Sequence, residues 1–224
     1  MTLDIDSFER AIVRHCSPTL AGMKPGCLFN VPGEFAADAD EEPAAQLDAW
    51  RRARELCSQL DELVAQERRR LEPSGVTLLV VARRMCGALV YVYRHDLLSR
   101  ALSNRRVSSQ LARWGYPTSG TGWLEAAIDR LADQLERCRR RSNEAAFPHE
   151  VGFFLGYPYD DVMGFIEHEG RDFLCCGCWK VYADRERAER CFERYRRCTQ
   201  AYESLLAMGA SIADLALVRI GVAA

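Results

Sequence analysis

The sequence predicts an α+β protein in which long amphipathic helices pack on a small sheet of about three or four strands. Apolar residues recur at the spacing of a helix in three long stretches of the 224-residue chain: 44–71, 123–141 and 185–208. Runs rich in β-branched and aromatic residues separate these stretches, at 76–82, 88–93 and 173–182. No polar linker is long enough to divide the chain, so we expect a single domain over residues 1–224.

Local signals predict the first elements of the chain. Ser7 can cap a short helix from Phe8 to about His15. A connection rich in proline and glycine should follow over 17–43, with a brief apolar piece at 27–29 and an acidic loop at 38–42. This connection would carry the chain to the first long helix.

That helix should bury one stripe of side chains, formed by Trp50, Ala53, Cys57, Leu60 and Val64. The run Pro73-Ser74-Gly75 then ends it. Val76–Ala82 is apolar on both faces, which indicates the centre of the sheet. We expect Ala88–Tyr93 to pair with it.

The second half should alternate short helices with one strand. Short helices are expected at 96–102 and 108–114, ahead of the long helix over 123–141. Pro148 should open another that ends near Gly156, and Asp160 should cap the helix over 161–168. The segment 173–182 is expected to form a third strand. Asp184 should cap the last long helix, whose buried stripe would comprise Ala188, Cys191, Tyr195, Cys198, Tyr202 and Leu205.

Composition excludes several classes of protein. The formal charge is −2, so no strongly basic surface favours nucleic acid or an anionic membrane. The N-terminus has no basic stretch followed by an apolar one, and the longest apolar run, 76–82, is too short to span a membrane. We therefore expect a cytoplasmic protein whose ten cysteines are reduced thiols.

Three segments hold polar groups that could form a site for a ligand or a metal. The candidate residues are His15, Cys16 and Lys24 in the first, His149 and Glu150 in the second, and Cys175, Cys176, Cys178 and Lys180 in the third. Aromatic residues lie beside them at Tyr157, Tyr159 and Trp179. Iron or zinc would suit thiol and imidazole ligands. The residues specify no reaction, so catalysis stays undecided.

The spacing of the third segment allows two interpretations. Cys175 and Cys178 have the spacing of a metal knuckle, but the chain offers no second pair at similar spacing. On a regular strand, Cys176, Cys178 and Lys180 would share a face, and the ammonium would favour a nearby thiolate. The alternative is that these cysteines are small apolar residues that pack a strand.

The two other segments have similar alternatives. His149 should precede a helix, where the positive end of the helix dipole favours a neutral ring that can bind or accept a proton. Cys16 should follow the end of the first helix, where the field opposes a thiolate unless Lys24 or a charged His15 compensates. Both could instead be structural residues.

These features support two hypotheses. In the first, groups from the three segments converge on a metal or on a small redox-active or anionic ligand. In the second, the protein is a non-catalytic module that binds a protein partner, such as a redox or metal-handling protein, through an exposed patch of Tyr157, Tyr159 and Trp179. Convergence of the thiols and imidazoles in space would distinguish the two.

Three motifs carry a family resemblance. They are His-Cys-x-Pro-Thr-Leu-Ala-Gly-x-Lys at 15–24, Phe-Pro-His-Glu-x-Gly-x-Phe-Leu-Gly-Tyr-Pro at 147–158, and Cys-Cys-Gly-x-Trp-Lys-Val-Tyr at 175–182. Together they resemble the bacterial domain-of-unknown-function family 3793, found chiefly in anaerobes. The resemblance implies one cytoplasmic domain with reduced thiols and no established activity. The family's pattern is commonly aromatic at the position of Cys178, so the resemblance does not imply the Cys175–Cys178 pair.

Overall fold

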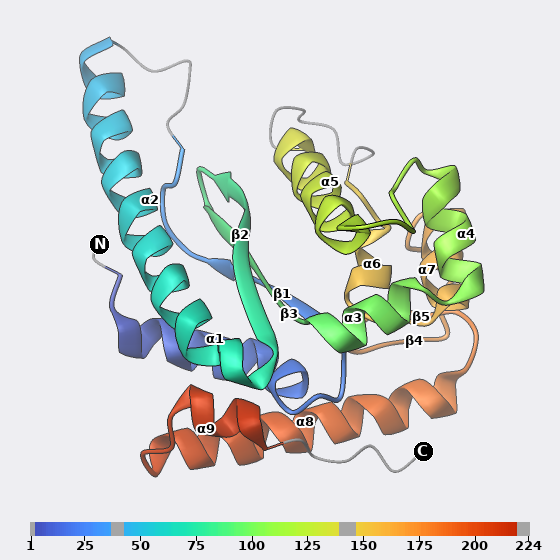
Figure 1. Cartoon of the computed structure of the whole chain (residues 1–224). Coiled ribbons are helices and arrows are strands. Elements are labelled where there is room, and N and C mark those ends of the chain that lie inside the picture. Colours follow the sequence, from blue (N-terminus) through green and yellow to red (C-terminus); the bar gives the residue numbers. More distant parts are fainter. Residues whose placement is uncertain (1–2, 37–42, 139–146, 219–224) are drawn as a thin grey trace.

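A computed structural model describes residues 3–36, 43–138 and 147–218, so the acidic loop expected at 38–42 lies outside the described residues. A three-stranded antiparallel sheet lies at the centre, in the order β1-β3-β2 (Figure 1). Its strands are β1 (Gly26–Val31), β2 (Val76–Arg84) and β3 (Gly87–Arg94). A separate two-stranded sheet pairs β4 (Cys175–Cys176) with β5 (Lys180–Val181). The predicted α+β class is confirmed.

In chain order the helices of the described residues are α1 (Ile5–Leu20), α2 (Pro43–Leu71), α3 (His95–Leu102), α4 (Arg105–Arg113), α5 (Trp123–Cys138), α6 (Val151–Phe154), α7 (Tyr159–Glu167), α8 (Arg185–Ala207) and α9 (Ile212–Leu217). A 3-10 turn, η1 (Glu72–Ser74), follows α2. The three predicted long helices are therefore present as α2, α5 and α8, although 139–141, the expected end of α5, lie outside the described residues. Asp184 caps α8 as expected, because its carboxylate accepts a hydrogen bond from the Arg187 amide at 3.0 Å.

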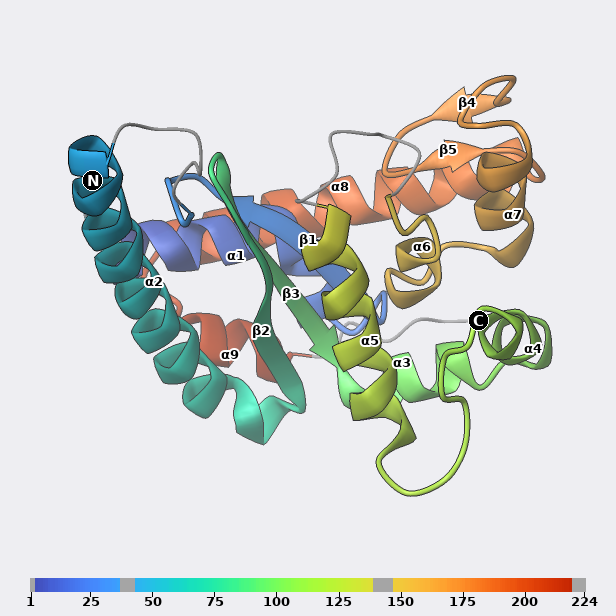
Figure 2. The same ribbon diagram turned by 90° about the horizontal axis from the view of Figure 1, so that it is seen from above.

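Helices cover both faces of the central sheet (Figure 2). Alternate side chains of β3 point to opposite faces: Val90 and Val92 join a core with α1, α2, α8 and α9, whereas Tyr91 and Tyr93 join a core with α3 to α7. Burial on both faces explains why the strands carry so few polar residues. The second core faces the region of the candidate site.

The strand order corrects two expectations. The central strand is β3, not the run at 76–82, because the segment expected as a connection forms β1 and pairs with the free edge of β3. The segment 173–182 does not join this sheet. It turns back on itself at Gly177, whose amide donates to the Trp179 carbonyl at 3.1 Å, and forms the β4–β5 hairpin. A side chain at Gly177 would meet the Phe192 ring, so the turn lies directly on α8.

The limits of two helices also differ from the prediction. Asp4 and not Ser7 caps α1, and the helix continues through Pro18 to Leu20. Proline inside a helix removes a backbone donor and crowds the carbonyl of the preceding turn. Every residue from Cys16 to Leu20 is buried, so packing outweighs that cost. His15 and Cys16 therefore lie within the helix, so the field expected at a helix end does not act on Cys16. In α7, Pro158 and not Asp160 occupies the N-cap position.

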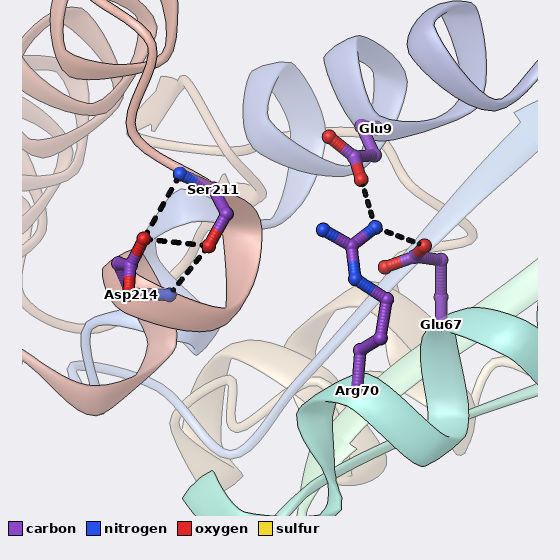
Figure 3. A network of polar contacts seen from close by, with 5 residues as sticks. All are labelled: Glu9, Glu67, Arg70, Ser211 and Asp214. Carbon is purple, nitrogen blue, oxygen red and sulfur yellow. Dashed lines mark hydrogen bonds and ion pairs between the residues drawn. The ribbon is translucent and has the colours of Figure 1, made fainter.

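Two predicted core residues are exposed. Trp50 on α2 is 60% exposed and Leu205 on α8 is 39% exposed. On α2 a charged residue, Glu67, is instead fully buried, and Arg70 bonds both Glu67 and Glu9 of α1 (Figure 3). The same view shows the capping box of α9, in which Ser211 and Asp214 bond each other's backbone amides.

A buried arginine connects three helical elements that are distant in the sequence. The Arg94 guanidinium, at the end of β3, is fully buried. It donates to the carbonyls of Thr19 and Leu20 at the end of α1, of Ser74 in η1 and of Ala216 in α9. Carbonyls at helix ends carry partial negative charge, which favours a cation there. No pattern in the sequence predicts this role for Arg94.

Candidate ligand-binding site

Asp161 organises the region that contains the second and third motifs. It lies in the first turn of α7 and is buried. Its carboxylate accepts hydrogen bonds from the Trp179 indole at 2.7 Å and from the amides of Tyr182 and Ala183 at 2.8 and 3.0 Å. One carboxylate thus fixes the hairpin and the start of α8 against α7. The sequence pattern predicts only a helix at Asp161 and does not indicate this role.

A cavity of about 340 Å³ lies between α6, α7 and this hairpin. Most of its lining is aromatic or aliphatic, and includes Phe147, Val151, Tyr157, Val162, Phe165 and Trp179. The polar groups that join them are His149, Asp161, Cys176 and Lys180, together with Cys178. A small cavity with few polar groups is typical of a site for a small ligand. The structure thereby brings candidates of the second and third segments to one place.

His149 lies at this cavity between two rings. Its imidazole is 4.9 Å from the Phe165 ring and 5.7 Å from the Phe147 ring, centroid to centroid. Burial lowers the pKa of His149 below its usual 6.5, and Glu150 opposes this shift. A neutral ring, able to donate and accept a hydrogen bond, results at neutral pH. Glu150 itself does not line the cavity and accepts a hydrogen bond from the Tyr116 hydroxyl at 2.9 Å.

Lys180 provides the positive charge of the cavity. It is directly opposite Cys176 in the hairpin register. Its ammonium donates to the Gly170 carbonyl at 2.7 Å and lies 5.6 and 5.0 Å from the ring centroids of Phe165 and Phe173. An ammonium has three donor hydrogens, so this carbonyl leaves donors for a ligand.

Among the described residues, the cysteines of the hairpin belong to no cluster of potential metal ligands. Burial raises the pKa of both Cys175 and Cys178, which disfavours their thiolates. Within 3–36, 43–138 and 147–218, no three or more His, Cys, Asp or Glu side chains are grouped so that they could hold a metal ion. The knuckle spacing at 175–178 therefore has no support from the geometry.

The thiol of the first segment lies elsewhere. Cys16 is fully buried in the core that α1 and β1 share, and its free thiol lies next to the free thiol of Cys27 on β1. Burial raises the pKa of Cys16 well above its usual value. Cys27 donates to the His15 carbonyl at 2.8 Å, and the His15 ring stacks on Phe29 at 5.8 Å. Neither Cys16 nor His15 lines the cavity at His149.

Lys24 does reach the second segment. Its ammonium lies 5.4 Å from the Tyr157 ring centroid and 5.8 Å from that of Tyr195 on α8. Tyr157 in turn stacks on Trp179 at 5.0 Å, and Tyr159 lies under the Arg106 guanidinium at 4.1 Å. The three candidate aromatic residues are half-buried and packed, so they do not form the exposed patch that we expected.

Several residues of this region carry no functional signal in the sequence. Phe165 and Tyr195 were assigned only to helices, and Cys27 only to a short apolar piece. The position of Cys27 close to Lys24 in the sequence is a signal that could indicate a role. The proximity of its thiol to that of Cys16, however, depends on how β1 crosses α1. Local spacing does not contain that information.

These observations define a mixed α+β protein with a small, aromatic-lined cavity between a helix pair and a hairpin. A family model described as "Protein of unknown function (DUF3793)" matches residues 12–216, and the chain belongs to this family. The resemblance inferred from the motifs is thereby confirmed. Comparisons with curated proteins and with solved structures gave no match. In the described part of the chain, no helix combines the length and the apolar character needed to cross a bilayer.

Proposed function

We propose that this protein binds a small organic ligand with a planar, apolar body and one acidic group in the cavity at His149 and Lys180. We place this function in a single cytoplasmic domain. The observation that carries the proposal is the convergence of the second and third motif segments on one cavity, where a lysine is the principal cation. Binding without catalysis suffices to explain this arrangement.

The lining determines the chemistry of the ligand. The rings of Tyr157, Phe165 and Trp179 offer flat apolar surfaces. Asp161 also lines the cavity, but its carboxylate already accepts three protein hydrogen bonds and so attracts a cationic ligand less. Lys180 retains donors and has no ion pair to a described residue. An acidic group would therefore bind at Lys180, with the neutral His149 ring as a further donor.

The two chain lysines, Lys24 and Lys180, provide a matched pair of variants. Benzoate and indole-3-carboxylate, each compared with its primary amide, would be titrated by calorimetry. We expect the carboxylates to bind more tightly than the amides. Lys180→Met should remove this preference, a loss of about tenfold or more for one charge-assisted hydrogen bond. Lys24→Met should retain the preference, since Lys24 does not line this cavity.

Two results would contradict the proposal. One is a preference for the carboxylate that survives Lys180→Met unchanged. The other is stoichiometric iron or zinc in protein purified without oxygen, which would restore the metal hypothesis despite the geometry. Elemental analysis of the same preparation measures this directly.

A protein-binding function is the second candidate, and one observation favours it. Phe147, Phe173 and Leu174, at and near the mouth of the cavity, are 37%, 42% and 51% exposed. Exposed apolar side chains that lie together are typical of interaction surfaces. If none of the carboxylates binds, this second function becomes the better explanation of the region.

A further inference from the structure

A second, larger hollow of about 680 Å³ lies on the other side of Tyr157. The loop after α1, the α3–α4 pair and the segment around 156–160 surround it. Tyr157 lines both this hollow and the cavity at His149, so its ring forms a wall between them. The two spaces have different linings, because the hollow is rich in cations.

Four cationic side chains line the hollow: Lys24, Arg100, Arg106 and Arg187. The one carboxylate in its lining, Asp160, is bound by both terminal nitrogens of Arg106, so these charges neutralise each other. Within the described ranges, no ion pair joins the side chains of Lys24, Arg100 or Arg187 to a carboxylate. The hollow thus has an excess of three positive charges.

Lys24 is the strongest indication of a ligand. Only 9% of its surface is exposed, although it carries an ammonium group. Among the described residues this ammonium contacts the faces of Tyr157 and Tyr195 but has no hydrogen-bond acceptor. Aromatic faces offset only part of the cost of removing an ammonium from water, so a buried lysine normally has an anionic partner. Cys16 and Lys24 lower the pKa of the nearby Cys27 thiol to about 7, so this thiol offers the ammonium part of an anionic charge. No hydrogen bond joins the two side chains, however, and the Cys27 thiol donates to the His15 carbonyl instead.

We propose that the hollow binds the phosphate group of a small molecule. The Lys24 ammonium would meet the phosphate at the floor, and Arg100 and Arg187 would hold it from the rim. Several convergent cations suit a doubly charged group with three or more acceptor oxygens better than a single carboxylate. The volume exceeds that of a bare phosphate, which leaves room for the rest of the molecule. This site is independent of the ligand proposed above for Lys180.

The presence of only two lysines makes a direct test possible. Protein labelled with ¹³C at the lysine Cε gives one lysine signal for each site, and Lys24→Met and Lys180→Met assign them. Inorganic phosphate and pyrophosphate would be titrated at constant ionic strength, with chloride as the reference. We expect a saturable shift of the Lys24 signal that chloride at the same ionic strength does not produce.

The rim provides a variant that keeps Lys24 in place. Arg100→Gln with Arg187→Gln should weaken pyrophosphate binding by about tenfold or more. The matched control is Arg105→Gln with Arg194→Gln, at exposed positions of α4 and α8 outside the hollow. It removes the same amount of charge and should leave binding unchanged.

Three outcomes would overturn the proposal: no saturable shift of Lys24 at millimolar phosphate or pyrophosphate, an equal shift of Lys24 with chloride at the same ionic strength, or equal weakening by the rim and control variants. The last two would indicate a general effect of surface charge. Because carboxylate binding is measured at Lys180, failure of either proposal leaves the other intact.

Discussion

At the scale of single residues, Asp161 determines how the segments around the candidate site are held together. Its three hydrogen bonds connect α7, the hairpin and the start of α8, and all three donors belong to the third motif or to the residue after it. The cavity keeps its shape only while these segments stay together. Asp161 is thus a structural residue within the site, whereas His149 and Lys180 are the groups offered to a ligand.

Asp161→Ala should lower the free energy of unfolding by about 2–4 kcal/mol, because three half-buried donors lose a charged acceptor. Urea unfolding measures the change. Asp161→Asn should cost less, since an amide oxygen can still accept from Tyr182 and Ala183. Asp133→Ala, on an exposed position of α5, is the control and should change stability by no more than about 0.5 kcal/mol. A cost for Asp161→Ala near that of the control would show that other contacts hold the hairpin.

At the scale of elements, the contact of α1 with α2 includes a buried charge. Glu67 of α2 is fully buried, and Arg70 bonds it together with Glu9 of α1 (Figure 3). Burial raises the pKa of Glu67 above its usual 4.5, and Arg70 opposes that shift. The folded protein therefore holds the Glu67 proton to higher pH than the unfolded chain does. This contribution to stability is present below pH 4.5 and is lost as pH rises through the folded pKa.

Arg70→Met should destabilise the protein at pH 7 by about 2–4 kcal/mol, because it leaves the buried carboxylate without a cation. Glu67→Gln should be neutral or stabilising at pH 7, and it should reduce the loss of stability between pH 5 and 7. Unfolding curves at both pH values measure this. A larger loss from Glu67→Gln than from Arg70→Met would contradict the interpretation.

At the scale of the whole molecule, the first and second motifs meet at one glycine. Gly156 has a φ of +76°, and a Cβ there would lie 2.4 Å from Cδ of Pro25, the neighbour of Lys24. A side chain at this position would therefore displace the loop that carries the buried ammonium. The glycine of the second motif thus permits the close approach that completes the cationic hollow.

Gly156→Ala should weaken pyrophosphate binding although every charge remains. Gly75→Ala is the matched control, because Gly75 has a φ of +73° but nothing within 4 Å of the added Cβ. Both variants should lose about 1–2 kcal/mol of stability from backbone strain. Gly156→Ala should lose more than this and should alone affect binding. Equal binding in the two variants would remove the proposed role of the Gly156–Pro25 contact.

The sequence alone determined the features that depend on neighbours along the chain. The 3.6-residue periodicity defined α2, α5 and α8, and a short polar side chain before a helix predicted the Asp184 cap. The motifs identified the family. The same periodicity wrongly predicts that Trp50 is buried. An apolar side chain at helical spacing can still lie beyond the edge of the core.

Only the tertiary structure decided which distant segments meet. Both β2 and β3 are apolar, so the central position of β3 followed from the pairing of β1, and the buried Arg94 and Glu67 had no signal in the periodicity. The same holds for Lys24, which reached Tyr157 and Tyr195 only through the packing of α1 against α8 and the turn at Gly156. Periodicity records which face of an element is apolar, whereas a site depends on the register and contacts between elements.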